Sequence, residues 1–142
     1  MNRARVLIAD DHAFVLDSLV NLLKDKFEVV AAVTDGHLLV DAASRLRPDV
    51  IVTDISMPGL SGIEAFERLK AAGVEAKVIV LTVHTDAELA AKLIRSGVSG
   101  FVMKLLATSE LVSAIEQVLL GHSYVSPSLA MDGDAEKRES RD

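Results

Sequence analysis

The 142-residue sequence contains no cysteine. This absence excludes a disulfide framework, thiolate chemistry and a zinc–cysteine site, and it suits the reducing cytoplasm. The sequence also has no long apolar segment near its start, because Met1 to Arg5 leads directly into a short apolar run. A signal peptide or a membrane span needs a longer run. We therefore expect a soluble cytoplasmic protein that makes no contact with a membrane.

Basic residues are also scarce. The 15 Lys and Arg residues are outnumbered by 21 Asp and Glu residues, which gives a formal net charge of -6. A protein that binds nucleic acid needs a basic face to displace counterions from phosphates. Residues 126–142 mix acidic with basic side chains and lack the alternating apolar residues of a helix-turn-helix. We expect one domain over residues 1–125, a polar linker or disordered tail over 126–142, and no direct binding of nucleic acid.

Short apolar runs alternate with amphipathic segments over the first 125 residues. Strands are predicted at residues 5–9, 27–33, 50–54, 77–82 and 100–103. Helices are predicted at residues 13–24, from 36 to before Pro48, at 63–72, at 86–95, and from the capping residues Thr108 and Ser109 to Leu119. The alternation predicts one α/β domain with helices on both faces of a parallel sheet, because each right-handed crossover lays its helix back on the sheet.

Polar side chains stand where four of the predicted strands end. They are Asp10 and Asp11 after the first strand, Asp54 at the end of the third, Thr82 at the end of the fourth and Lys104 after the fifth. Taken alone, Asp54 could simply cap the turn before Pro58. However, parallel strands put their carboxyl ends on one edge of the sheet, where ligands bind in open α/β folds. We therefore expect these five side chains to meet in one site.

Three carboxylates in one site need a cation. Within about 4 Å of one another they repel by a few kcal/mol per pair at an effective dielectric constant near 20. Oxygen ligands without a His or Cys set favour Mg²⁺, and His12 and His84 are interpreted as peripheral because they lack partner ligands at metal spacing. The metal, the Thr82 hydroxyl and the Lys104 ammonium suit a phosphoryl group. Asp54 is then the nucleophile that forms an acyl phosphate.

These residues resemble a known family. In this order, Asp10-Asp11, Asp54 with Met57-Pro58 and Gly62, Thr82 and Lys104 are similar to the receiver domain of bacterial two-component response regulators, over about residues 4 to 122. The resemblance implies a flavodoxin-like (βα)5 fold, a doubly wound parallel sheet with strand order 2-1-3-4-5. It also implies a sensor histidine kinase as phosphodonor and a switch, with self-catalysed phosphorylation and dephosphorylation, rather than an enzyme that turns over a substrate.

The resemblance assigns a role to each matched residue. Asp54 is the phosphoacceptor, Asp11 a direct Mg²⁺ ligand, Asp10 a ligand through water, the backbone carbonyl of Ser56 a further ligand, Thr82 the switch hydroxyl, Phe101 the switch aromatic and Lys104 the lysine of the site. A lone aromatic residue on a short strand usually packs in the core, so Phe101 is also expected there, and the two roles are compatible.

The flanking residues resemble the NarL/FixJ subfamily. Asp10-Asp11-His12 and the segment from Gly121 to Pro127 carry this likeness, and members usually continue into a LuxR-type helix-turn-helix. Leu105-Leu106 depart from the pattern, which has proline or a polar residue after the lysine. The resemblance implies transcription control through an output domain absent from this sequence. We expect a receiver cut from a longer regulator; a single-domain regulator that acts by protein contact is the alternative.

The fourth predicted helix suggests a surface for self-association. Its apolar residues form two stripes, a core stripe of Ala87, Ala91 and Ile94 and an outer partner face of Leu89, Ala90 and Leu93. We expect a homodimer through this helix and the fifth strand after phosphorylation.

Two other functions use part of the same chemistry. A haloacid-dehalogenase-type phosphatase has a second Asp two residues after its nucleophile, where this sequence has Ser56. A flavodoxin-like cofactor binder has a Gly/Ser/Thr-rich phosphate cradle after the first strand, where this sequence has Asp10-Asp11. Both alternatives fit the residues less well than the receiver.

Overall fold

The computed structural model describes residues 3–83 and 86–127. His84 and most of the predicted tail, residues 128–142, lie outside the described residues. The strands are β1 (Arg5–Ala9), β2 (Glu28–Val33), β3 (Val50–Asp54), β4 (Lys77–Thr82), β5 (Gly100–Met103) and β6 (Tyr124–Val125). The helices are α1 (Ala13–Leu23), α2 (Gly36–Leu46), α3 (Gly62–Ala71), α4 (Ala87–Arg95) and α5 (Ala107–Leu119), with a 3-10 turn at Lys104–Leu106.

All strand pairs in the sheet are parallel, and their order is β2-β1-β3-β4-β5-β6. The predicted order 2-1-3-4-5 is therefore confirmed, and a short sixth strand extends it. The reversal of strand order lies between β1 and β3, which are neighbours in the sheet. In doubly wound folds, ligands bind at the carboxyl ends of the strands near this point.

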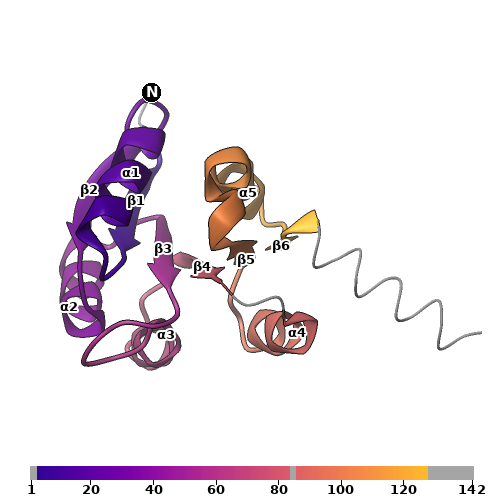
Figure 1. Ribbon diagram of the computed structural model, residues 1–142. Coiled ribbons are helices and arrows are strands. Elements are labelled where there is room, and N and C mark those ends of the chain that lie inside the picture. Colours follow the sequence, from indigo (N-terminus) through magenta and orange to yellow (C-terminus); the bar gives the residue numbers. More distant parts are fainter. Residues whose placement is uncertain (1–2, 84–85, 128–142) are drawn as a thin grey trace, which may run out of the picture.

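Helices cover both faces of the sheet (Figure 1). Along each strand, alternate residues enter two separate cores. Val6, Ile8 and Val52 pack with α1 and α5, whereas Leu7, Ile51 and Phe101 pack with α2, α3 and α4. The central strands β1 and β3 are almost wholly buried, as expected for strands covered on both sides. Among the described residues, no helix is long and apolar enough to cross a membrane.

The loop after β3 is held close to the strand. Ser61 caps α3 by accepting a hydrogen bond from the Glu64 N–H, and the Glu64 carboxylate accepts one from the Ser61 N–H. At Gly62 a Cβ atom would overlap the backbone carbonyl of Asp54, so only glycine allows this approach. The start of α3 is thereby fixed beside the end of β3.

Three sequence predictions need correction. The helix α5 begins at Ala107 rather than after a cap at Thr108 or Ser109, because the 3-10 turn leads into it without a break. The domain extends past residue 125, since the Ser126 side chain is completely buried. The third correction concerns α4.

The predicted partner face of α4 is wrong in its orientation. Ala90 and Leu93 are 2% and 4% exposed and pack into the core, with Leu89 partly buried against it. Ala91, predicted to lie in the core, is exposed. The outward side of the helix carries Glu88, Lys92 and Arg95 besides Ala91. Of the predicted face, Ala90 and Leu93 therefore belong to the fold and present no surface for a second copy.

Candidate functional site

The polar side chains predicted to meet do lie at one edge of the sheet. Asp10 directly follows β1, Asp54 is the last residue of β3, Thr82 is the last residue of β4 and Lys104 directly follows β5. The register explains the convergence: Ala9 pairs with Thr53, Asp54 with Leu81, and Thr82 with Met103. Each of these strands ends within one residue of its neighbour, so their last residues share the carboxyl edge.

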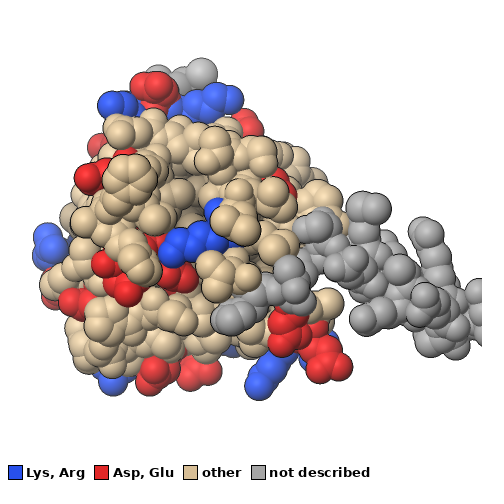
Figure 2. All heavy atoms as spheres, in the orientation of Figure 1, with Lys and Arg blue, Asp and Glu red and all other residues tan. Residues whose placement is uncertain are grey.

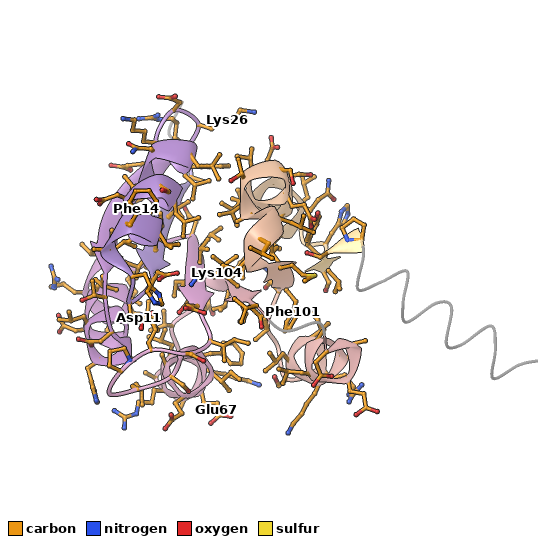
Figure 3. All side chains as sticks on the ribbon, viewed as in Figure 1. Asp11, Phe14, Lys26, Glu67, Phe101 and Lys104 are labelled. Carbon is orange, nitrogen blue, oxygen red and sulfur yellow. The ribbon has the colours of Figure 1, made fainter. Side chains whose placement is uncertain are left out.

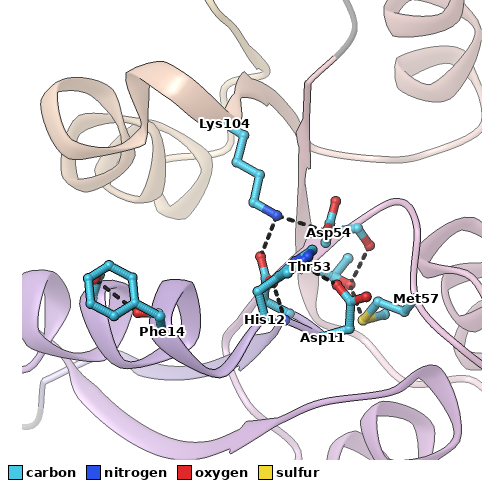
Figure 4. A network of polar contacts seen from close by, with 9 residues as sticks. Asp11, His12, Phe14, Thr53, Asp54, Met57 and Lys104 are labelled. Carbon is cyan, nitrogen blue, oxygen red and sulfur yellow. Dashed lines mark hydrogen bonds and ion pairs between the residues drawn. The ribbon is translucent and has the colours of Figure 1, made fainter.

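Lys104 joins two of these strand ends. Its Nζ atom lies 2.8 Å from Asp10 Oδ2 and donates a hydrogen bond of 2.9 Å to Asp54 Oδ2 (Figure 4). The lysine side chain is 14% exposed, that of Asp54 is 10% exposed and that of Asp10 is fully buried. The ammonium group therefore bridges two carboxylates that lie 44 positions apart in the sequence.

Asp10 is the most deeply buried of the charged groups. Its Oδ1 atom accepts a hydrogen bond from the His12 N–H at 2.9 Å. Its Oδ2 atom is paired with Lys104 alone among the described residues, at 2.8 Å from the ammonium nitrogen. A buried carboxylate needs such a partner, because burial of an unpaired charge is costly.

The pKa of Lys104 reflects this arrangement. Burial favours the neutral amine and pulls the pKa down, but the hydrogen bonds and charges of Asp10 and Asp54 together outweigh burial and raise the pKa above its ordinary value. The ammonium form is thus firmly held at neutral pH. It provides a fixed positive charge beside the Asp54 carboxylate.

Asp11 completes an acidic cluster at the edge. One ligand atom each from Asp10, Asp11, His12 and Asp54 lies within 4.8 Å of the others. Three carboxylates here face the single ammonium of Lys104, so negative charge is in excess. Oxygen donors in excess of the local positive charge fit a hard divalent cation such as Mg²⁺. The residues present therefore suit the predicted metal.

His12 is closer to the site than predicted. Its Nδ1 atom lies 3.1 Å from Asp11 Oδ1 and 3.4 Å from Asp10 Oδ1, while its side chain stays 68% exposed. The interpretation of His12 as peripheral is therefore wrong in position. The sequence signal that could have placed His12 in the site is its position directly after Asp10-Asp11 and directly before Ala13, the first residue of α1.

The other predicted site residues do not all lie in this cluster. Thr82 is 1% exposed at the end of β4. It directly follows Leu81, which pairs with Asp54 in the sheet. Phe101 is fully buried and packs in the same core as α4. Figure 3 shows it between the sheet and this helix. Ser56 lies in the exposed loop after β3. The structure thus brings Asp10, Asp11, Asp54 and Lys104 into one cluster, with Thr82 on the adjacent strand.

The cluster is open to the surface on one side. Figure 2 shows acidic groups beside a basic side chain near the middle of the viewed face, surrounded mainly by uncharged atoms. Three large apolar side chains are exposed close to it in sequence: Phe14 in the first turn of α1, Val83 after Thr82 and Leu105 after Lys104, at 84%, 62% and 86%. At this edge the Asp54 side chain is itself 10% exposed to solvent.

Comparison with known proteins identifies the family. A model of the response regulator receiver domain matches residues 6–116. The chain belongs to the response regulator receiver domain family. This receiver domain is 34% identical over 128 residues to the response regulator GacA of Pseudomonas aeruginosa, a match that covers 89% of this chain and 60% of GacA. It is 35% identical over 127 residues to UvrY of Escherichia coli, covering 88% of this chain and 58% of UvrY.

A solved structure agrees with both fold and subfamily. The crystal structure of a LuxR-family two-component response regulator from Aurantimonas sp. SI85-9A1 matches with a TM-score of 0.88 and 31% identity, covering 96% of this chain and 99% of that one. The predicted likeness to the NarL/FixJ subfamily, whose output domains are of LuxR type, is therefore confirmed. The receiver domain spans about 60% of the length of the curated relatives it matches.

Proposed function

We propose that this receiver domain accepts a phosphoryl group on Asp54 from a sensor histidine kinase. The observation that supports it best is the bridge from Lys104 Nζ to Asp10 and Asp54, at 2.8 and 2.9 Å. A purely structural lysine would have one partner or point to solvent. Here the ammonium is fixed beside a carboxylate that remains accessible at the edge of the sheet.

The transfer uses the chain's own groups in defined roles. A carboxylate oxygen of Asp54 forms a bond to phosphorus, the bond from phosphorus to the kinase imidazole nitrogen breaks, and its electron pair returns to that nitrogen. Lys104 neutralises the oxygens of the transferred group, which carry the charge in the transition state. Thr82, on the neighbouring strand, donates a hydrogen bond from its hydroxyl to one of these oxygens.

Mg²⁺ is the proposed cofactor, held by Asp11 and Asp54 with the backbone carbonyl of Ser56. We assign Asp10 a contact through water, because Lys104 lies 2.8 Å from its Oδ2 atom. When bound, the ion neutralises phosphoryl oxygens that would otherwise meet an acidic cluster. The excess of carboxylates over ammonium groups supports this assignment.

The acyl phosphate then acts as a signal. Thr82 and Phe101 are the proposed switch residues, since the hydroxyl sits at the carboxyl edge and the ring lies in the core beneath α4. The relatives are longer than the matched region, and we propose that the switched domain controls a C-terminal DNA-binding output domain, as part of a transcription regulator acting in the cytoplasm. DNA contact then belongs to that domain and not to the residues of the receiver.

The test is incorporation from a small phosphodonor. Acetyl phosphate with Mg²⁺ is expected to add a single phosphoryl group, seen by mass spectrometry as an acid-stable and alkali-labile adduct. Asp54→Asn removes the nucleophile and is expected to abolish the adduct. Asp49→Asn makes the same change at the opposite edge of the sheet and is expected to label like the wild type. Full labelling of the Asp54→Asn variant would disprove the assignment.

A further inference from the structure

Ser126 is one of the few polar side chains that are completely buried among the described residues. Its hydroxyl oxygen accepts a hydrogen bond from the Met103 N–H at 2.9 Å, and its own N–H donates to the Phe101 carbonyl at 3.0 Å. Ser126 therefore binds the backbone of β5 at Phe101 and Met103, just before Lys104, from the outer side of the sheet.

The segment carrying Ser126 is attached to β5 as a strand. Gly100 pairs with Tyr124 and Phe101 with Val125, both in parallel register. A longer strand would continue this ladder with a backbone carbonyl as the next acceptor for β5. The Ser126 hydroxyl instead receives the Met103 N–H and closes the ladder.

This hydrogen bond lies next to the functional lysine in the chain. Met103 ends β5, and Lys104 directly follows it as the first residue of the 3-10 turn. On its inner side Met103 pairs with Thr82 of β4, so β4 and Ser126 together fix both sides of the strand end. The direction of the Lys104 side chain depends on this backbone, because the residue has no regular strand partner of its own.

We propose that Ser126 is a positioning residue for Lys104, which couples the segment after α5 to the phosphorylation site. This inference rests on the proposed function. The hydroxyl favours the backbone position in which the ammonium reaches Asp54. By reciprocity, an occupied site that holds Lys104 in this position strengthens the hydrogen bond to Ser126. The segment between α5 and Pro127 thus contains a residue that responds to the state of Asp54.

The first test compares two hydroxyl deletions in the same segment. Ser126→Ala is expected to lower the rate of phosphorylation at saturating acetyl phosphate by about fivefold, the size that one ordinary hydrogen bond supplies. Affinity for Mg²⁺ is expected to stay unchanged, because Asp10 and Asp11 are not touched. Tyr124→Phe removes the hydroxyl that donates to Glu110 Oε1 at 2.9 Å and is expected to keep the wild-type rate.

A double variant distinguishes an effect of Ser126 on the position of Lys104 from a general destabilisation of the domain. If Ser126 acts through Lys104, Ser126→Ala has no further effect on the residual rate of Lys104→Ala. A fivefold loss that persists in that background would overturn the proposal, as would a wild-type rate for Ser126→Ala alone. If the wild type is not labelled at all, the proposed function itself fails and this inference falls with it.

A measurement on the wild type covers the case in which Ser126→Ala does not fold. Amide hydrogen exchange at Met103 is expected to slow by about fivefold on phosphorylation, since the same hydrogen bond is strengthened. Tyr124, whose N–H donates to the Ser99 carbonyl at the other end of the pairing, is the internal reference and is expected to change less. Equal exchange at Met103 in both states would overturn the coupling.

Discussion

Charged side chains at the two edges of the sheet differ in their burial and in their binding partners. At the amino edge, Arg5 donates to the backbone carbonyls of Leu46 and Arg47 at 2.7 and 3.1 Å, and its N–H donates to Asp49 Oδ2 at 2.8 Å. These side chains are exposed to solvent, and their short hydrogen bonds go to backbone groups; the ion pair of Arg5 with Glu28 is long, at 3.8 Å, and exposed. They tie the end of α2 to the start of β1, which is a structural role.

At the carboxyl edge, the charged groups are buried and satisfy one another. Asp10, Asp54 and Lys104 form ion pairs across strand ends, and Lys104 is the only partner of Asp10 Oδ2 among the described residues. Burying charges in this way contributes little to stability and is often unfavourable. The contrast indicates that the amino edge is arranged for the fold and the carboxyl edge for a ligand.

The largest expected effect comes from removing the bridging ammonium. Lys104→Ala is expected to lower the phosphorylation rate with acetyl phosphate by about 100-fold or more, the usual loss when a preorganised group facing the transition state is deleted. The rate is measured from the time course of the adduct by mass spectrometry.

Lys77→Ala is the matched control, because Lys77 is exposed at the amino end of β4. Its rate is expected to equal that of the wild type. Equal losses in the two variants would mean that lysine charge acts at long range, and the distinction between the edges would not hold for catalysis.

A second pair of variants tests metal binding at the two edges. Asp11→Ala removes a proposed direct ligand and is expected to weaken Mg²⁺ binding by at least about tenfold, or about 1.4 kcal/mol. Asp10→Ala is expected to weaken it less, since Lys104 already occupies Asp10 Oδ2. Asp49→Ala should leave the affinity unchanged. Titration calorimetry measures all three, and equal affinities for the Asp10 and Asp11 variants would remove the difference between direct and water-mediated ligation.

The same variants are expected to change stability in opposite directions without metal. Asp11→Ala relieves repulsion in the acidic cluster and should raise the free energy of unfolding by about 0.5 kcal/mol, a small value because the side chain is 30% exposed. Asp49→Ala loses the acceptor of the Arg5 N–H and should lower it by about 1 kcal/mol. Urea unfolding in EDTA gives both values. Destabilisation of both variants would show that the carboxyl edge also serves the fold.

The sequence predicts the carboxyl edge well for a simple physical reason. Each strand shows as an apolar run, and a polar residue at its end is visible in the sequence. Because the strands are parallel and in register, Asp10, Asp54, Thr82 and Lys104 converge without any knowledge of side-chain packing. The strand order follows from the family resemblance and not from the periodicity.

Three features are not predictable in this way. In α4, apolar residues occur on both sides of a nine-residue helix, so periodicity alone does not distinguish Leu93 in the core from Ala91 on the surface. His12 reaches the acidic cluster because of how α1 starts, which is a local backbone detail. Ser126 resembles a linker residue in composition, and only the pairing of β6 with β5 reveals its buried hydroxyl.

The smallest effect at neutral pH is expected from the hydrogen bond between Tyr124 and Glu110, in which only the glutamate is charged. Tyr124 donates its hydroxyl to Glu110 Oε1, and burial together with this carboxylate raises the pKa of the tyrosine from 10.0 to about 12. The folded protein therefore holds the proton more tightly than the unfolded chain. The contribution of Tyr124 to stability is complete below pH 10 and is lost as the pH rises toward about 12.

This pair can be observed directly, because Tyr124 is the only tyrosine and the sequence has no tryptophan. The absorbance of tyrosinate is expected to titrate near pH 12 in the folded protein and near its ordinary value of 10.0 in urea. Glu110→Gln removes the charge but keeps an acceptor, and should move the folded midpoint only part of the way down, since burial is the larger cause. A midpoint near 10.0 in the native wild type would show that the hydroxyl is solvated, and that β6 is held to the domain by its backbone and Ser126 without help from α5.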